Sequence, residues 1–229
     1  MLRATASSPF RLSLDSPLYG LAGFGLGLVL AWHYGWQARD LVWSLWLSSL
    51  VLGYATIVLG IVGSARQLAA GGSATAVAVA AGLGLFLLAF FTVHFGMFHV
   101  VHSVFLNFFF PLVQKRDGDP LPSPALYGRV LASYWPWLLA AAIAERTALR
   151  AAWQAEPKPG AKTPLAFSPD AAYRNVVRMH LLIFFFFFTS FLRIENRFIY
   201  AVVYVVYFFP PAALFGATLL KKGAPQAPS

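Results

Sequence analysis

The sequence contains no cysteine and few charged residues, and each shortage excludes a class of protein. Without cysteine the chain has no disulfide, no thiolate ligand for a metal and no cysteine nucleophile. Only 11% of the residues are charged whereas 59% are hydrophobic, a balance that excludes an ordinary soluble globular domain. A glycine-rich phosphate loop and the Gly-x-Ser-x-Gly motif of hydrolases are also absent. The composition therefore indicates a protein of the lipid bilayer.

Acidic residues are fewer than basic ones, with eight Asp and Glu against 17 Lys and Arg, which gives a formal net charge of +9. In another context this excess would suggest nucleic-acid binding. Here the basic residues fall between apolar runs, an arrangement that sets the orientation of membrane proteins. We therefore expect the lipid bilayer as a partner, other membrane protein subunits as an open alternative, and no nucleic acid.

The apolar runs predict an all-α, polytopic transmembrane helical bundle of about six spans, with residues 1–229 as a single transmembrane domain. The spans are predicted at residues 18–36, 41–63, 73–110 and 129–144, from 176 onward, and up to 220. Gly23 and Gly27 are four residues apart and are expected to let another helix approach closely. Trp43 and Trp46 lie near one end of the second span, where aromatic residues of a membrane interface are found.

The third span is overlong, because residues 73–113 contain no charged side chain and helix can continue until Pro111. About 37 residues at 1.5 Å each give roughly 55 Å of helix, against a hydrocarbon core of about 30 Å. Either one helix is tilted or kinked, at Gly82, Gly84 or Gly96, or two spans meet near Gly96, which would make seven spans. With one helix, eleven of the 17 Lys and Arg lie on the inner side, whereas two spans leave eight and remove the bias. Six spans are therefore preferred.

The same charge count predicts a multi-pass protein of the bacterial inner membrane with both termini in the cytoplasm. Residues 1–16 are expected to be a retained cytoplasmic segment, because they lack the apolar core and cleavage site of a signal peptide. Residues 154–169 read as a Pro-rich cytoplasmic linker, and residues 223–229 as a disordered tail. Pro136 is expected to kink the fourth span.

Three of the five histidines, His94, His99 and His102, lie within nine positions of the overlong span. His99 and His102 are three residues apart, share a helix face and could chelate one metal, while His94 and His102 differ by about 80° around the helix. Ionisable groups inside a membrane are costly and face the protein interior, which favours a function. The alternatives to metal or haem ligation are neutral histidines that hydrogen-bond between helices, and proton or substrate handling.

His180 and Arg178 stand where the fifth span enters the bilayer, at the inner level where Glu145 leaves it. This predicts an inner polar cluster of Glu145, Arg178 and His180, with an ordinary interfacial ion pair as the alternative. The eight positions from His94 to His102 cover about 12 Å, so one ion cannot take every histidine. We expect His94 and His180 to form the cross-helix pair, for a haem with two axial histidines or a metal completed by Glu145.

The run His-Phe-Gly-Met-Phe-His-Val-Val-His at 94–102, with Met-His at 179–180, resembles an uncharacterised family of bacterial multi-pass integral membrane proteins. The family pattern is His-aromatic-Gly-x-Phe-x-x-x-His in one span and Met-His in a later one. The resemblance implies His94, His102 and His180 as the shared positions and leaves His99 as a local addition. Members of the family also have a Glu after the aromatic residues of the second span, where this chain has serines.

Two functions follow from the sequence. The first is a bacterial inner-membrane protein that binds a transition metal or haem through intramembrane histidines, with His94 and His180 as cofactor ligands and His99 and His102 as further metal ligands. The second is a non-catalytic accessory subunit of a larger membrane complex. Its aromatic helices, including five consecutive phenylalanines at 184–188, would then pack against partner helices, lipid, quinone or pigment. The sequence assigns no catalytic residue.

Overall fold

The computed structural model describes residues 17–112 and 122–154, together with positions 165, 177, 180–182, 184–185, 187–189, 201 and 204–205. All regular secondary structure in these parts of the chain is helical. The helices are α1 (Pro17–His33), α2 (Ala38–Ala70), α3 (Ala74–Phe109), α4 (Pro124–Ala144) and α5 (Arg146–Trp153). Several predicted features lie outside the described residues: the segments 1–16 and 223–229, most of the linker 154–169, and Arg178.

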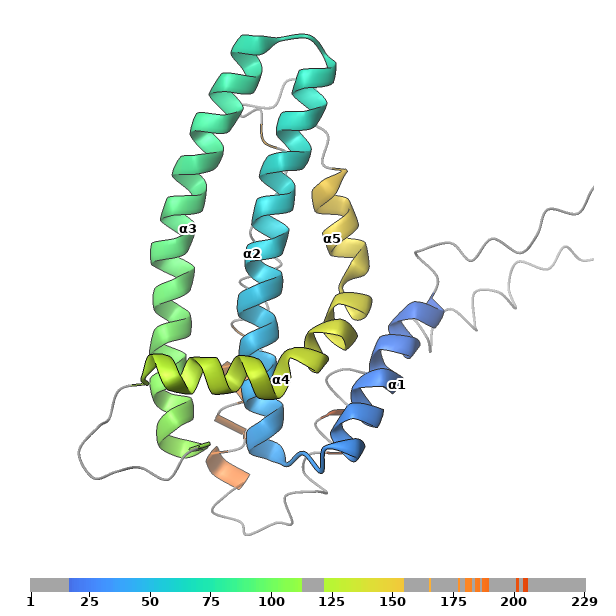
Figure 1. Ribbon diagram of the computed structural model, residues 1–229, viewed down its shortest axis with the longest axis vertical. Helices are drawn as coiled ribbons and strands as arrows, with labels where there is room; N and C mark the ends of the chain where they lie inside the picture. Colours follow the sequence, from blue (N-terminus) through green and yellow to red (C-terminus); the bar gives the residue numbers. More distant parts are fainter. Residues whose placement is uncertain are drawn as a thin grey trace, which may run out of the picture.

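Helices α2 and α3 form a long antiparallel pair that dominates the structure (Figure 1). They are joined by a short turn in which Gly72 has a φ of +76°, a conformation that favours glycine. Ser73 then caps α3, because its hydroxyl accepts a hydrogen bond from the backbone N–H of Ala76 at 3.2 Å. Helix α3 continues without interruption for 36 residues, so the prediction of one overlong helix is confirmed and no break occurs near Gly96.

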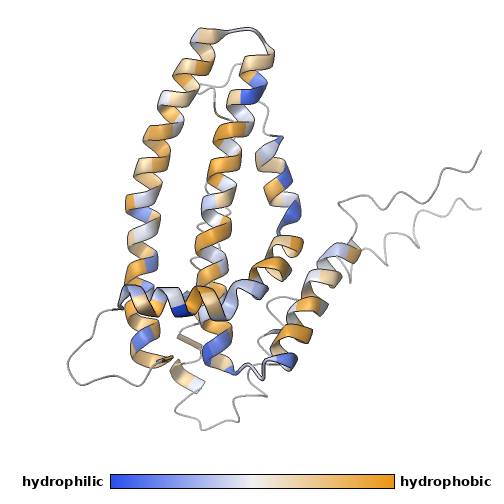
Figure 2. Ribbon diagram, in the orientation of Figure 1, coloured by the Kyte–Doolittle hydropathy of each residue, from blue (hydrophilic) through white to orange (hydrophobic). Residues whose placement is uncertain are grey.

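Helix α2 is also overlong, with 33 residues where the sequence predicts a span of only 23. The prediction ended at Gly63 because polar residues follow, but arginine and glutamine are good helix formers and extend the helix to Ala70. α2 and α3 are the two described helices that are long and apolar enough to cross a membrane. Figure 2 shows that α3 is hydrophobic along most of its length, whereas α2 has hydrophilic residues near both of its ends.

Two tryptophans of α2 donate hydrogen bonds to backbone carbonyls at the C-terminal half of α3 and at its C-cap. The Trp43 indole N–H donates to the carbonyl of Phe110 at 2.9 Å, and that of Trp46 donates to the carbonyl of His99, also at 2.9 Å. Both indoles are almost completely buried. The two side chains share one helix face, three residues apart, and that face meets α3.

Helix α1 packs against α4 at its two central glycines. A Cβ atom on Gly23 would lie 2.9 Å from the carbonyl oxygen of Ala140, so the two backbones are almost in contact. Beside Gly27 lies the ring of Tyr204, whose hydroxyl donates to the carbonyl of Phe24 at 2.9 Å. The prediction that these glycines allow a close helix approach is confirmed.

Helix α4 does not run alongside the long pair. Its first part crosses α2 and α3, and the chain then bends and continues into α5, which lies beside α2 (Figure 1). Pro136 lies inside α4, where its ring removes a backbone hydrogen bond and bends the helix. The crossing is held by side chains: the Tyr134 hydroxyl donates to Asp40 Oδ1 at 2.7 Å. The predicted kink agrees with this bend, and the predicted residues 129–144 lie within α4.

Candidate functional site

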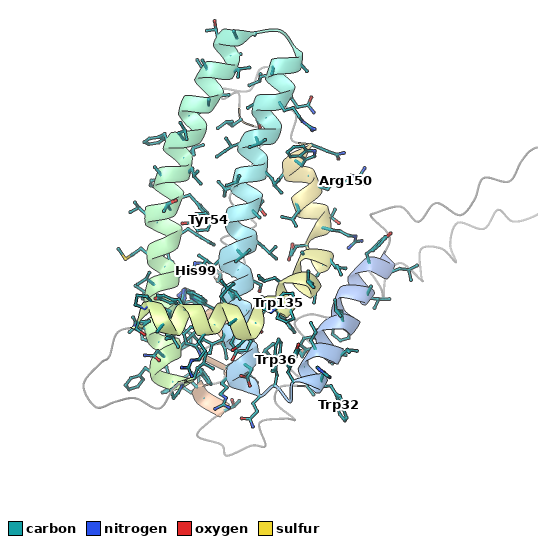
Figure 3. All side chains as sticks on the ribbon, viewed as in Figure 1. Trp32, Trp36, Tyr54, His99, Trp135 and Arg150 are labelled. Carbon is teal, nitrogen blue, oxygen red and sulfur yellow. The ribbon has the colours of Figure 1, made fainter. Side chains whose placement is uncertain are left out.

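One face of α3 collects the buried side chains of that helix, and two histidines lie on it. The buried positions Phe91, Phe95, His99, His102 and Leu106 recur every three or four residues, which is the spacing of a single helix face. His99 and His102 have exposed fractions of 0% and 2%. Figure 3 places His99 in the region between α3 and α2. The site is therefore built on the face that α3 turns toward the interior.

His94 is excluded from this face by the helix geometry. It immediately precedes Phe95, and one residue corresponds to a rotation of about 100°, so its side chain is exposed. Its ring stacks on Phe90 at a centroid distance of 5.6 Å and meets the edge of Phe98 at 5.1 Å. The Phe98 ring in turn lies 6.5 Å from the ring of His180.

His102 and His180 are in direct contact. Nε2 of His102 lies 2.9 Å from Nδ1 and 2.6 Å from Nε2 of His180, and the ring centroids are 3.8 Å apart. Imidazole nitrogens at these distances share a proton, with one ring donating and the other accepting. The sequence predicts His94 as the partner of His180, but His102 occupies that place. The correction follows from the rotation of α3, which turns His102 inward and His94 outward.

His99 presents a lone pair to the interior. Its Nδ1 lies 3.0 Å from the carbonyl oxygen of Phe95, which can only accept, so Nδ1 carries the proton and Nε2 of the neutral ring does not. Nε2 is buried and has no hydrogen-bond partner among the residues described. Leaving a buried acceptor unsatisfied costs about 1–3 kcal/mol, so Nε2 is positioned to accept from a ligand or to bind a cation. The rings of His99 and His102 are 6.3 Å apart.

Three residues that the sequence did not predict hold this site in place. Trp46 binds the backbone of His99 and stacks on Tyr127 of α4, with ring centroids 5.6 Å apart and an interplanar angle of 7°. The Tyr127 hydroxyl lies 2.8 Å from Oγ of Ser103, the residue after His102. The available signal was the pairing of Trp43 with Trp46 at the same three-residue spacing as His99 and His102, which marks two helix faces that can meet.

The chain matches a family of unknown function over residues 18–208. The chain belongs to DUF6498. This match covers the five described helices from Leu18 onward and the histidines of the site, and it confirms the expectation of an uncharacterised family. No curated protein and no solved structure matches the chain.

The distance between the His102 and His180 rings bears on the cofactors that the sequence suggests. Two nitrogens bound to one tetrahedral ion, each at about 2.0–2.1 Å, are roughly 3.3 Å apart, so a small separation of the rings would admit a metal. A haem with both rings as axial ligands needs the nitrogens about 4 Å apart with the porphyrin between them. The contact of 2.6–2.9 Å between His102 and His180 leaves no room for that plane. Either group would require the two rings to move apart, by less for a metal ion than for a bis-histidine haem.

Among the residues that the structure describes, the carboxylate expected to complete a metal site is not found beside this histidine pair. Within the described residues, no group of three or more His, Asp or Glu side chains is arranged to hold a metal. Glu145 lies at the junction of α4 and α5. Arg178 lies outside the described residues, so the cluster of Glu145, Arg178 and His180 stays a prediction.

Proposed function

We propose that this DUF6498 protein is a multi-pass protein of the bacterial inner membrane that binds a transition metal through His102 and His180. The observation that carries the proposal is the direct contact of the two imidazoles, with nitrogens 2.6–2.9 Å apart on different helices. The charge distribution of the sequence supports an orientation with both termini in the cytoplasm.

The surface of α3 supports the membrane location. Large apolar side chains are exposed on it over most of its length: Val79, Leu85, Phe86, Phe90, Val93, Met97, Val101, Phe105 and Phe108 are each at least 46% exposed. In water such a surface is unfavourable, at about 25 cal/mol per Å² of apolar area, and continuous apolar patches of this extent are rare on soluble monomers. Lipid tails remove that cost without any further protein contact.

The chemistry of the ligands supports a transition metal. Neutral imidazole nitrogens bind Zn²⁺, Cu²⁺ and Ni²⁺. His102 and His180 supply two nitrogens, and Nε2 of His99 supplies a lone pair one helical turn away on the same face. The hydrogen bond from His99 Nδ1 to the Phe95 carbonyl orients that ring, as the partners of metal-bound histidines do.

Metal titration of the purified full chain tests the proposal. The detergent-solubilised protein is stripped with a chelator, titrated with Zn²⁺ or Cu²⁺, and analysed for bound metal per chain. We expect about one equivalent, abolished in His102→Ala and His180→Ala and weakened roughly 10- to 100-fold in His99→Ala. The matched controls are His33→Ala and His94→Ala, whose rings are exposed, and both should keep the metal. Equal binding in wild type, His102→Ala and His180→Ala would overturn the metal site.

A second candidate is an accessory subunit of a membrane complex. Phe184, Phe185 and Phe188 are 57%, 42% and 62% exposed, and aromatic surfaces of this kind serve helix–helix contacts as well as lipid contacts. Phe184→Leu with Phe188→Leu keeps the apolar character but changes the shape. If a partner docks here, the double variant should lose a co-purifying subunit in mild detergent. If wild type and the double variant both purify as a single chain of the same size, docking of a partner at this surface is ruled out.

A further inference from the structure

A pocket lies at the end of the molecule where the α1–α2 turn meets α4. Its volume is about 450 Å³, within the range of about 300–1,000 Å³ typical of sites for small ligands. The side chains that matter for its chemistry are Tyr34, Trp36, Arg39, Asp40, Arg129 and Trp135. None of these residues belongs to the histidine site.

The pocket has an excess of positive charge. Its charged lining residues are Arg39, Arg129 and Asp40. Asp40 is engaged by the fold, since its two oxygens accept from the Tyr134 hydroxyl at 2.7 Å and from the backbone N–H of Gln37 at 2.8 Å. Arg39 Nε lies 3.8 Å from Asp40, beyond hydrogen-bond distance, and its side chain is 52% exposed.

Arg129 is the stronger indication of a ligand. Its side chain is exposed, and among the described residues it makes no hydrogen bond and no ion pair. Arg39 comes from the first turn of α2 and Arg129 from α4, so the crossing of these helices brings both arginines to one pocket. Guanidinium groups donate paired hydrogen bonds that match the oxygens of phosphate.

Aromatic rings form the rest of the pocket. Tyr34 and Trp36 are stacked with centroids 5.9 Å apart, and Trp135, which is 54% exposed, lines the α4 side. Trp32 lies at the same end of the molecule in Figure 3 and is 90% exposed. Exposed tryptophans and tyrosines are typical of the level of lipid headgroups.

We propose that this pocket binds a phosphate group, with Arg39 and Arg129 donating to its oxygens and the aromatic rings against the organic part of the ligand. The phosphate is that of a phospholipid headgroup or of a soluble phosphate ester. The site is separate from the histidine pair and goes beyond the proposed metal function.

Binding of defined probes to the full chain in an uncharged detergent tests the proposal. The probes are dihexanoyl phosphatidylglycerol, glycerol phosphate, and dihexanoylglycerol, which has the same acyl chains and no phosphate. We expect at least one phosphate probe to bind about 10-fold or more tightly than dihexanoylglycerol, and Arg39→Gln and Arg129→Gln each to weaken it about 10-fold. Arg150→Gln is the matched control, because that arginine lies on α5 and donates to Gln154 at 3.2 Å.

The results distinguish a lipid from a soluble phosphate ester, and this pocket from the histidine pair. Tighter binding of phosphatidylglycerol than of glycerol phosphate identifies a lipid, and the reverse order identifies a soluble ester. His180→Ala should bind the phosphate probe like wild type, so loss of the metal site leaves this result unaffected. Equal affinity for dihexanoylglycerol, or unchanged phosphate binding in both Arg39→Gln and Arg129→Gln with unchanged unfolding midpoints, would overturn the proposal.

Discussion

Trp46 joins the packing of the two long helices to the histidine site. Its indole N–H donates to the carbonyl of His99 at 2.9 Å, and its ring stacks on Tyr127 from the crossing helix α4. One side chain therefore connects α2, α3 and α4. The position of the His99 ring depends on this contact with its backbone and on the Phe95 ring, whose centroid lies 4.3 Å from that of His99.

Replacing Trp46 by phenylalanine should lower the free energy of unfolding by about 1–2 kcal/mol. The variant removes the hydrogen bond to His99, for which a net contribution of roughly 0.5–1.5 kcal/mol is usual, and part of the stacking on Tyr127. Trp32→Phe is the matched control, because Trp32 is 90% exposed and should change stability by less than about 0.5 kcal/mol. Denaturant titration in one detergent measures the free energy of unfolding of both variants. Equal losses of stability in Trp46→Phe and Trp32→Phe would show that the Trp46 hydrogen bond contributes nothing.

Gly53 determines how closely α2 and α3 approach beside the site. A Cβ atom added there would lie 2.6 Å from Cζ of Phe95, a distance that real Cβ atoms do not tolerate. Phe95 is completely buried and stacks on Phe91 with centroids 4.2 Å apart, so its ring cannot simply turn away. A larger residue at position 53 would therefore push the two helices apart, and His99 would move with its neighbour Phe95.

Gly53→Ala should destabilise the protein by about 1–3 kcal/mol, the usual effect of overpacking a buried contact. Gly82→Ala is its opposite: no atom lies within 4 Å of the position of the added Cβ, so better helix propensity should stabilise α3 by up to about 1 kcal/mol. Thermal unfolding of the two variants under identical conditions compares them. A higher unfolding midpoint for Gly53→Ala than for Gly82→Ala would contradict this account of the contact.

Helices α2 and α3 set the dimensions of the whole molecule. At 1.5 Å per residue, 33 and 36 residues give about 50 and 54 Å, well beyond a hydrocarbon core of about 30 Å. If α2 crosses the bilayer, the α1–α2 turn and the α2–α3 turn must lie on opposite sides of it. The charge count of the sequence predicts that the α2–α3 turn lies in the cytoplasm.

Single-cysteine labelling measures this topology, and the absence of native cysteine makes every label specific. With a membrane-impermeant maleimide and sealed inside-out vesicles, Ala70→Cys should react at once and His33→Cys only after permeabilisation. Phe86→Cys, at a position 66% exposed on α3, should react only in detergent because lipid covers it. Labelling of Ala70→Cys and His33→Cys from the same side would exclude α2 as a membrane span.

The sequence by itself determined that the long helices of the described residues form. Long apolar runs between basic residues predicted α2 and α3, Pro111 marked the end of α3 at Phe109, and the spacing of Gly23 and Gly27 predicted a close helix contact that the structure confirms. These properties depend on hydrophobicity, helix propensity and backbone geometry, which act locally. Local interactions also explain why the overlong helix could be predicted although its glycines suggested a break.

Only the tertiary structure decided which residues meet. About 80° around the helix separates His102 in the interior from His94 on the surface, and the rotation of α3 is determined by its fit against Trp43 and Trp46 of α2. It turned His102 toward His180 and left His94 exposed. The crossing of α4 likewise brought Arg129 to Arg39. Such pairings depend on packing between residues far apart in the chain, which periodicity within one helix does not encode.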